Sequence, residues 1–101
     1  MDEQLTEIRI PGRVLRDICR FAEAASVKKL VLFGSRARGT NTKSSDIDLA
    51  VYGGSFDQFY EDIQEKTWSL LTFDLIDMNG NITADLKKEI QRDGVIIYEK
   101  N

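Results

Sequence analysis

The sequence predicts an α/β fold in which one small β-sheet packs against helices. Short runs rich in β-branched and aromatic residues alternate with segments whose apolar residues follow helical spacing. Glycine, asparagine and serine residues separate most of these segments, as is typical of turns. With 101 residues, the chain suits one domain, spanning residues 1–101, around a single hydrophobic core.

The first half of the chain is expected to form one helix and two strands. Apolar residues recur at helical spacing through residues 12–25, and Pro11 suits the start of a helix. The apolar runs at 29–33 and 47–52 predict two strands. The polar segment between them, residues 34–45, predicts a loop with room for one helical turn.

The second half is expected to form two helices and two strands. Ser55 is a residue type that caps helices, and aromatic residues on one side follow it. The run at 73–78 predicts a strand closed by an asparagine-glycine turn. A helix that ends at Gly94 and a short strand at 95–98 complete the fold. Residues 68–71 fit neither pattern clearly.

Composition narrows the classes of function. The formal net charge is -3 and the pI is about 4.9, which argues against non-specific binding to duplex nucleic acid. No stretch approaches the roughly 20 apolar residues of a membrane span, and the N-terminal stretch lacks the apolar core of an export signal. The single cysteine, Cys19, excludes an internal disulfide, so we expect a reduced protein of the cytoplasm without membrane contact.

Two carboxylates open the second predicted strand. Asp46 and Asp48 are separated by one residue, so their side chains point to the same side of a strand, while Ile47 and Leu49 point toward the helices. Two converging carboxylates repel each other unless a cation lies between them, and Mg2+ prefers such hard oxygen ligands. Because the chain contains no histidine, metal and acid/base chemistry has to use carboxylates.

A Gly-Ser pair ends the first predicted strand. Gly34 lets the backbone turn and lets a ligand approach closely, and Ser35 offers a hydroxyl and an N–H group. A helical turn after them would direct further N–H groups to the same place, which favours phosphate. Arg36 and Arg38 add positive charge. These features and the neighbouring carboxylates together predict a site for a metal-bound polyphosphate.

A two-metal site needs a third carboxylate, and the strand at 73–78 offers two candidates. Asp74 and Asp77 are three residues apart, so they lie on opposite faces of a strand and only one can face the site. Asp74 is favoured because it lies nearer the middle of the strand, where a carboxylate without a task would be costly. Asp77 stays open as the alternative, because a strand end is more easily solvated.

The spacing of these motifs resembles a known signature. Gly34-Ser35, ten further residues and then Asp46-x-Asp48 look like the GS-x10-D-x-D signature of nucleotidyltransferases of the DNA polymerase beta superfamily. The strings KLVLFGSRARG, SDIDLAV and DGVIIYEK are similar to the minimal nucleotidyltransferase subfamily, and the likeness covers nearly the whole chain. The resemblance implies a mixed sheet flanked by helices and transfer of a nucleoside monophosphate from an NTP, with pyrophosphate leaving.

The resemblance also implies roles for single residues. Gly34 and Ser35 would hold the β- and γ-phosphates, and Asp46 and Asp48 would bind two Mg2+ ions. Asp74, in the strand that matches the usual third carboxylate, would bind the catalytic ion and help activate the acceptor hydroxyl. ATP as the substrate is implied by the resemblance alone. In phosphoryl transfer, positioning and charge neutralisation supply most of the catalysis, so the lack of histidine is no obstacle.

A partner protein is implied in the same way. Larger relatives carry extra domains that grip the acceptor, whereas small members pair with an all-helical HEPN toxin, an RNase that they silence by adenylylating a tyrosine. An antitoxin that neutralises its toxin by binding alone is the main alternative, and transfer to a small molecule is a weaker one. Four aromatic residues are expected in the core or, where exposed, at a protein interface: Phe56, Phe59, Tyr60 and Trp68.

Overall fold

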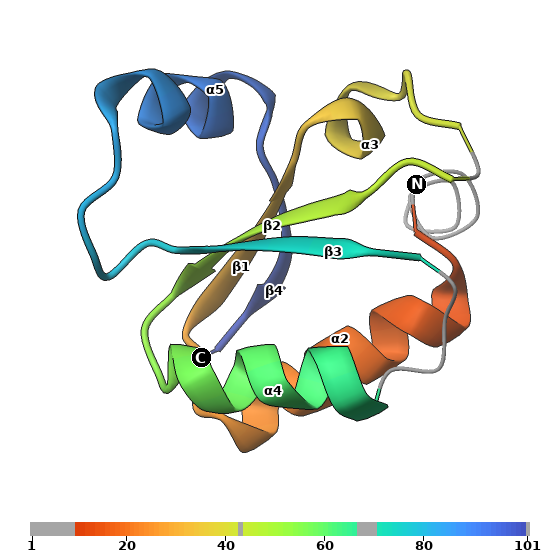
Figure 1. The fold of residues 1–101 in the computed structure, drawn as a ribbon, viewed down its shortest axis with the longest axis vertical. Helices are drawn as coiled ribbons and strands as arrows, with labels where there is room; N and C mark the ends of the chain where they lie inside the picture. The colour runs from red at the N-terminus through yellow and green to blue at the C-terminus, as the bar shows by residue number, and fades with distance from the viewer. Residues whose placement is uncertain (1–9, 43, 67–70, 101) are drawn as a thin grey trace.

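The computed structural model describes residues 10–42, 44–66 and 71–100, and four strands form its sheet. The strands are β1 (Lys29–Phe33), β2 (Ile47–Tyr52), β3 (Phe73–Asp77) and β4 (Val95–Glu99). They lie in the order β3-β2-β1-β4 (Figure 1). β1 runs antiparallel to both β2 and β4, whereas β2 and β3 are parallel. The sheet is therefore mixed.

Helices cover both faces of this sheet. They are α2 (Gly12–Ala24), α3 (Ser35–Arg38), α4 (Phe56–Lys66) and α5 (Ala84–Asp93). Figure 1 shows α2 and α4 together on one side of the sheet, with α3 and α5 at the opposite end of the molecule. None of the helices in the described part of the chain is long and apolar enough to cross a membrane.

The hydrophobic core has two parts, one on each face of the sheet. The larger part lies between the sheet and helices α2 and α4, and β1 and β2 supply alternate residues to it: Leu30, Leu32, Ile47, Leu49 and Val51. The smaller part lies under α5 and consists of Val31, Phe33, Ala50 and Ile90. Because both faces are covered, the two central strands read as continuous apolar runs in the sequence.

The predicted fold class, a small mixed sheet flanked by helices, is confirmed. Element ends differ from the prediction by one residue. The first helix ends at Ala24, β3 ends at Asp77, and β4 continues to Glu99. Met78 still donates its N–H to the Val51 carbonyl at 2.9 Å, so hydrogen bonding between the two parallel strands continues past β3.

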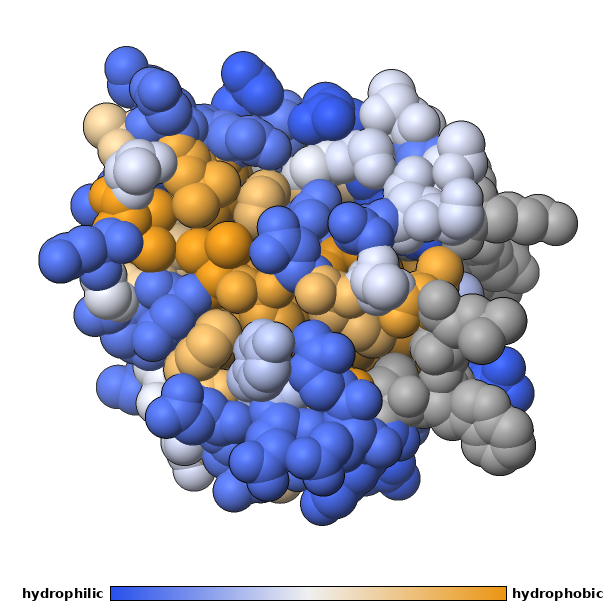
Figure 2. All heavy atoms as spheres, viewed as in Figure 1, coloured by the Kyte–Doolittle hydropathy of each residue, from blue (hydrophilic) through white to orange (hydrophobic). Residues whose placement is uncertain are grey.

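The aromatic residues after Ser55 divide between core and surface. Phe59 is fully buried, whereas Tyr60 is 47% exposed and packs its ring against Phe56 at 6.0 Å. Trp68 lies outside the described residues. Apolar side chains also gather on the surface along β3, an edge strand (Figure 2). The expectation that exposed aromatic residues mark a protein interface stays a prediction.

Candidate active site

Strand pairing brings the predicted site residues to one end of the sheet. Asp48 of β2 pairs with Asp74 of β3 in parallel register, so both side chains lie on the same side of the sheet. Asp48 also pairs with Phe33, the last residue of β1, which places Gly34 beside it. Asp46 lies just ahead of β2. Three segments that are distant in sequence therefore meet around Asp48.

Gly34 lies directly against the Asp48 carboxylate. Its φ of +76° belongs to the left-handed region that favours glycine, and a Cβ atom built there would overlap Oδ2 of Asp48. The Gly34 carbonyl accepts hydrogen bonds from the N–H groups of Ala37 and Arg38, both at 3.1 Å, and these bonds start α3. The predicted helical turn after the Gly-Ser pair is thus α3, and glycine is needed at its start for two independent reasons.

The Arg36 side chain lies inside the loop between β1 and β2 and donates hydrogen bonds to the backbone of that loop. The residue is only 3% exposed. Its Nε and Nη2 atoms donate to the Ser45 carbonyl at 3.1 and 2.9 Å, and Nη2 also reaches the Thr42 carbonyl at 3.5 Å. Burial lowers the pKa of this guanidinium, and the nearby charges of Asp46 and Asp48 act in the opposite direction. The sequence analysis placed Arg36 at the nucleotide site, and that role stays a prediction; the contacts described here tie its guanidinium to the backbone just before Asp46.

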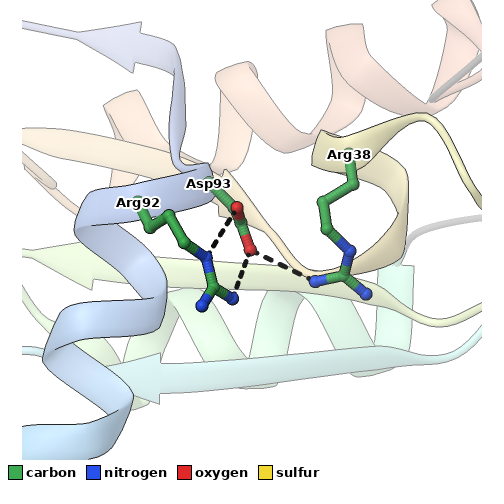
Figure 3. A network of polar contacts seen from close by, with 3 residues as sticks. All are labelled: Arg38, Arg92 and Asp93. Atoms are coloured by element: carbon green, nitrogen blue, oxygen red, sulfur yellow. Dashed lines mark hydrogen bonds and ion pairs between the residues drawn. The ribbon is translucent and has the colours of Figure 1, made fainter.

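Arg38 connects the same loop to α5. Its Nη1 atom donates to Oδ2 of Asp93 at 3.2 Å, and Arg92 binds the same carboxylate through Nε and Nη2 (Figure 3). The two arginines hold the pKa of the Asp93 carboxyl below its ordinary value, with the Arg92 hydrogen bond as the largest cause. The sequence analysis did not include Asp93 in the site.

Negative charge accumulates around Asp48. Burial raises the pKa of Asp48 to about 6, and the charges of Asp74, Asp46 and Glu89 push it in the same direction, while Arg38 opposes them. Glu89 belongs to α5 and was also missed. It lies four residues before Asp93, so a carboxylate pair at i, i+4 on one face of a predicted helix was the available signal.

The two candidates for the third carboxylate separate clearly in space. Asp74 stands in register with Asp48, whereas Asp77 stands in register with Val51 at the other end of β3. Asp77 accepts hydrogen bonds at 3.0 Å from both the backbone N–H and the side-chain amide of Asn79, so it stabilises the turn after the strand. The geometry places Asp74, and not Asp77, beside the other site residues.

The oxygen donors suit a hard cation, although their side chains are not gathered around one point. Among the described residues, no group of three His, Cys, Asp or Glu side chains lies close enough together to hold a metal ion. Asp46 accepts a hydrogen bond from the Thr72 hydroxyl, so its carboxylate is engaged at the start of β3. The mutual repulsion around Asp48 is nevertheless the kind that a bound cation relieves.

A cavity of about 400 Å³ lies elsewhere, at the opposite ends of β2 and β3. It is lined by residues 53–57 with Asp77 and Asn79. Neither the Gly-Ser turn nor Asp46, Asp48 or Asp74 lines it. Of the residues that the sequence analysis considered for the site, only Asp77, the alternative third carboxylate, does. The strand ends around Asp48 therefore remain the candidate site.

A mixed sheet with a Gly-Ser turn and in-register aspartates at one end is the arrangement that the nucleotidyltransferase signature predicts. The family model described as "Polymerase beta, Nucleotidyltransferase" matches residues 17–101. The chain therefore belongs to the polymerase beta nucleotidyltransferase family.

A solved structure supports the same fold. The chain is similar to a structure titled "Crystal structure of the toxin-antitoxin with AMP-PNP", with a TM-score of 0.67 and 22% sequence identity. The match covers 86% of this chain and 74% of that one. A search of curated proteins found no significantly similar sequence.

Proposed function

We propose that this domain transfers AMP from ATP to a hydroxyl group of a partner toxin, most plainly a tyrosine of a HEPN-type RNase, and so acts as its antitoxin. The observation that carries the proposal is the packing of Gly34 against Asp48, with Asp74 in register beside it. This juxtaposition puts a backbone turn suited to phosphate next to carboxylates suited to a cation.

The donor side of the reaction follows from these residues. Gly34 and Ser35 would bind the β- and γ-phosphates, while Asp46, Asp48 and Asp74 would hold two Mg2+ ions. The bound ions would neutralise the triphosphate and the leaving pyrophosphate. Asp74 would also take the proton of the acceptor hydroxyl, whose oxygen forms the new bond to the α-phosphorus as the bond to pyrophosphate breaks.

Three observations support a toxin as the acceptor. The sequence resembles minimal nucleotidyltransferases that pair with HEPN toxins, and the similar solved structure is described as a toxin-antitoxin with AMP-PNP, an ATP analogue. The apolar surface along the edge strand β3 is of the kind that protein partners cover (Figure 2).

Mass spectrometry of the partner tests the proposal. The purified domain is incubated with ATP, Mg2+ and the product of the neighbouring reading frame, which we expect to be the toxin, and that protein is expected to gain the mass of one AMP. Asp48→Asn is expected to reduce the rate at least about a hundredfold, because it removes a ligand for the ions. Asp57→Asn, on α4 across the sheet, is the matched control. An unmodified toxin in a complex that does form would contradict the proposal.

A second candidate is an antitoxin that acts by binding alone. It is favoured by the engagement of Asp46 with Thr72 and by the absence, among residues 10–42, 44–66 and 71–100, of a three-carboxylate group around one point. The double variant Asp46→Asn, Asp48→Asn decides between the candidates. Protection of cells from the toxin persists if binding is enough, and is lost with the complex intact if transfer is required.

A further inference from the structure

One carboxylate outside the predicted site holds two arginines. Asp93, the last residue of α5, accepts a two-pronged contact from Arg92, at 3.1 Å from Nε and 2.9 Å from Nη2. Oδ2 of Asp93, which accepts the bond from Nη2 of Arg92, also accepts a hydrogen bond from Nη1 of Arg38 at 3.2 Å (Figure 3). The Asp93 side chain is only 11% exposed, whereas the Arg38 and Arg92 side chains are 42% and 69% exposed, so these contacts lie at the protein surface with the carboxylate on their inner side.

The backbone fixes Asp93 relative to the sheet. Gly94, the next residue, lies so close to the Ile90 carbonyl that a Cβ atom there would overlap it, and the same atom would lie 2.6 Å from Cγ1 of Val31 in β1. Ile90 itself is buried in the smaller core. The end of α5 is thus pressed onto β1, and the two-pronged contact with Arg92 sets the direction of the carboxylate.

Arg38 interacts with Asp93 and also acts on the candidate site. It belongs to α3, whose first residue, Ser35, follows the glycine that packs against Asp48. The charge of Arg38 also acts on Asp48, where it opposes the other causes of the raised pKa. A guanidinium has five N–H donors, and Asp93 accepts one of them, which leaves the group able to bind further oxygen atoms.

We propose that Asp93 is a positioning residue that holds the Arg38 guanidinium toward the polyphosphate of the bound nucleotide. The inference rests on the proposed function, because it assumes a nucleotide at Gly34 and Asp48. Without Asp93, Arg38 is a half-exposed side chain that has to lose its conformational freedom each time it meets a phosphate.

Electrostatics alone predicts the opposite effect. Arg38 and Arg92 together carry two positive charges and Asp93 carries one negative charge, so neutralising Asp93 makes this corner more positive. That change should tighten the binding of an anionic ligand. A loss of affinity in Asp93→Asn would therefore report lost positioning, because the change in charge acts in the other direction.

Equilibrium binding of ATP with Mg2+, measured by calorimetry in the absence of a partner, tests the inference. Arg38→Gln is expected to weaken binding about tenfold, because it removes a charge-assisted hydrogen bond. Asp93→Asn is expected to weaken it about fivefold, near the upper limit for an exposed ion pair. In the Arg38→Gln background, Asp93→Asn is expected to have no further effect.

The controls separate positioning from general damage. Asp17→Asn breaks a comparable pair with Arg20 on α2 and is expected to bind ATP as the wild type does. Thermal unfolding is recorded for every variant. Arg92→Gln is the second variant, in case Asp93→Asn fails to fold. Because it also removes a positive charge, it is read through the same cycle: its loss of about twofold is expected to disappear in the Arg38→Gln background, whereas a loss due to charge alone would persist.

Three results would overturn the inference. Asp93→Asn binding ATP as tightly as the wild type, or more tightly, would show that the carboxylate does not position Arg38. An equal loss in the Arg38→Gln background would show that Asp93 acts through something else. Failure of the wild type itself to bind ATP would remove the proposed function as well, so the two failures are distinguishable.

Discussion

Asp48 is the site residue whose carboxylate feels the charges of several other residues of the candidate site. Its carboxylate touches the Gly34 backbone and lies within electrostatic reach of Asp46, Asp74 and Glu89. Burial and these neighbours raise its pKa from the ordinary value of 3.8 to about 6. Between these two values the folded protein binds more protons than the unfolded chain, so the free energy of unfolding falls as pH rises through this window.

Asp48→Asn is therefore expected to be more stable than the wild type at pH 8, where the wild-type carboxylate is ionised. After allowance for solvent screening, the gain is on the order of 1 kcal/mol, or about 4–8 °C in Tm. The gain should shrink toward pH 4. Thermal unfolding followed by circular dichroism, with a chelator present to remove divalent cations, measures it. A difference in Tm between the two proteins that stays constant from pH 4 to pH 8 would contradict this explanation.

Arg36 supplies a second prediction for a single residue. Arg36→Met leaves the Ser45 carbonyl without its two guanidinium donors inside the loop, so we expect a loss of about 2–4 kcal/mol in the free energy of unfolding. Urea denaturation measures the loss. Arg20→Met is the matched control, because Arg20 is exposed and pairs with Asp17 at the surface, where a change within about 0.5 kcal/mol is expected. Equal stability of the two variants would show that Arg36 does not hold the loop.

At the scale of elements, the junction between α5 and β4 depends on one glycine. Gly94→Ala would press a methyl group onto the Ile90 carbonyl and the Val31 side chain, and we expect a cost of about 1–3 kcal/mol. Gly12→Ala is the natural control, because nothing lies within 4 Å of the added atom and alanine favours the helix. Guanidinium denaturation of both variants tests this, and a stability of Gly94→Ala equal to that of Gly12→Ala would contradict it.

The elements themselves were readable from the sequence, but the contacts between them were not. Periodicity and apolar runs predicted every described strand and both ends of α2 to within one residue, together with the start of α4 and the end of α5. The direction of a long polar side chain has no such local signal. Arg36 folds back into its own loop and Arg38 reaches α5, and each outcome depends on partners that folding brings close.

The residues of the candidate site divide in the same way, into those that a local sequence pattern predicts and those that depend on contacts between distant segments. Asp74 was favoured over Asp77 because of its place in the strand, but that reason was wrong, since Asp74 is the more exposed of the two. What separates them is the parallel register of β3 with β2, which sets Asp74 beside Asp48.

The engagement of Asp46 by Thr72 and the approach of Glu89 could not be predicted from a local pattern, since they require the parallel pairing of β2 with β3 and the packing of α5. Asp93 was missed for the same reason, because in the sequence it only precedes Gly94, the predicted end of a helix.

Across the whole molecule, one face of the sheet packs the larger core, and the other face carries the candidate site at its end. The face toward α2 and α4 holds the larger core and none of the candidate site. The other face carries the smaller core under α5, and Asp48 and Asp74 lie at its end. Substitutions that empty the larger core are therefore expected to act on stability, whereas those around α5 can act on the site with less effect on folding.

Because Phe33 pairs with Asp48 across antiparallel strands, the number of residues between the Gly-Ser pair and Asp48 fixes the length of the connection between β1 and β2. The segment that joins them is a closed hairpin held from inside by Arg36, so the number of residues in it sets which side of β2 each residue faces. If one residue were removed and the loop did not compensate, the register of β2 against β1 would shift. The Asp48 side chain would then point toward the apolar core under α2 and α4. Homologues would then tolerate many changes of residue type in this hairpin and few changes in its length.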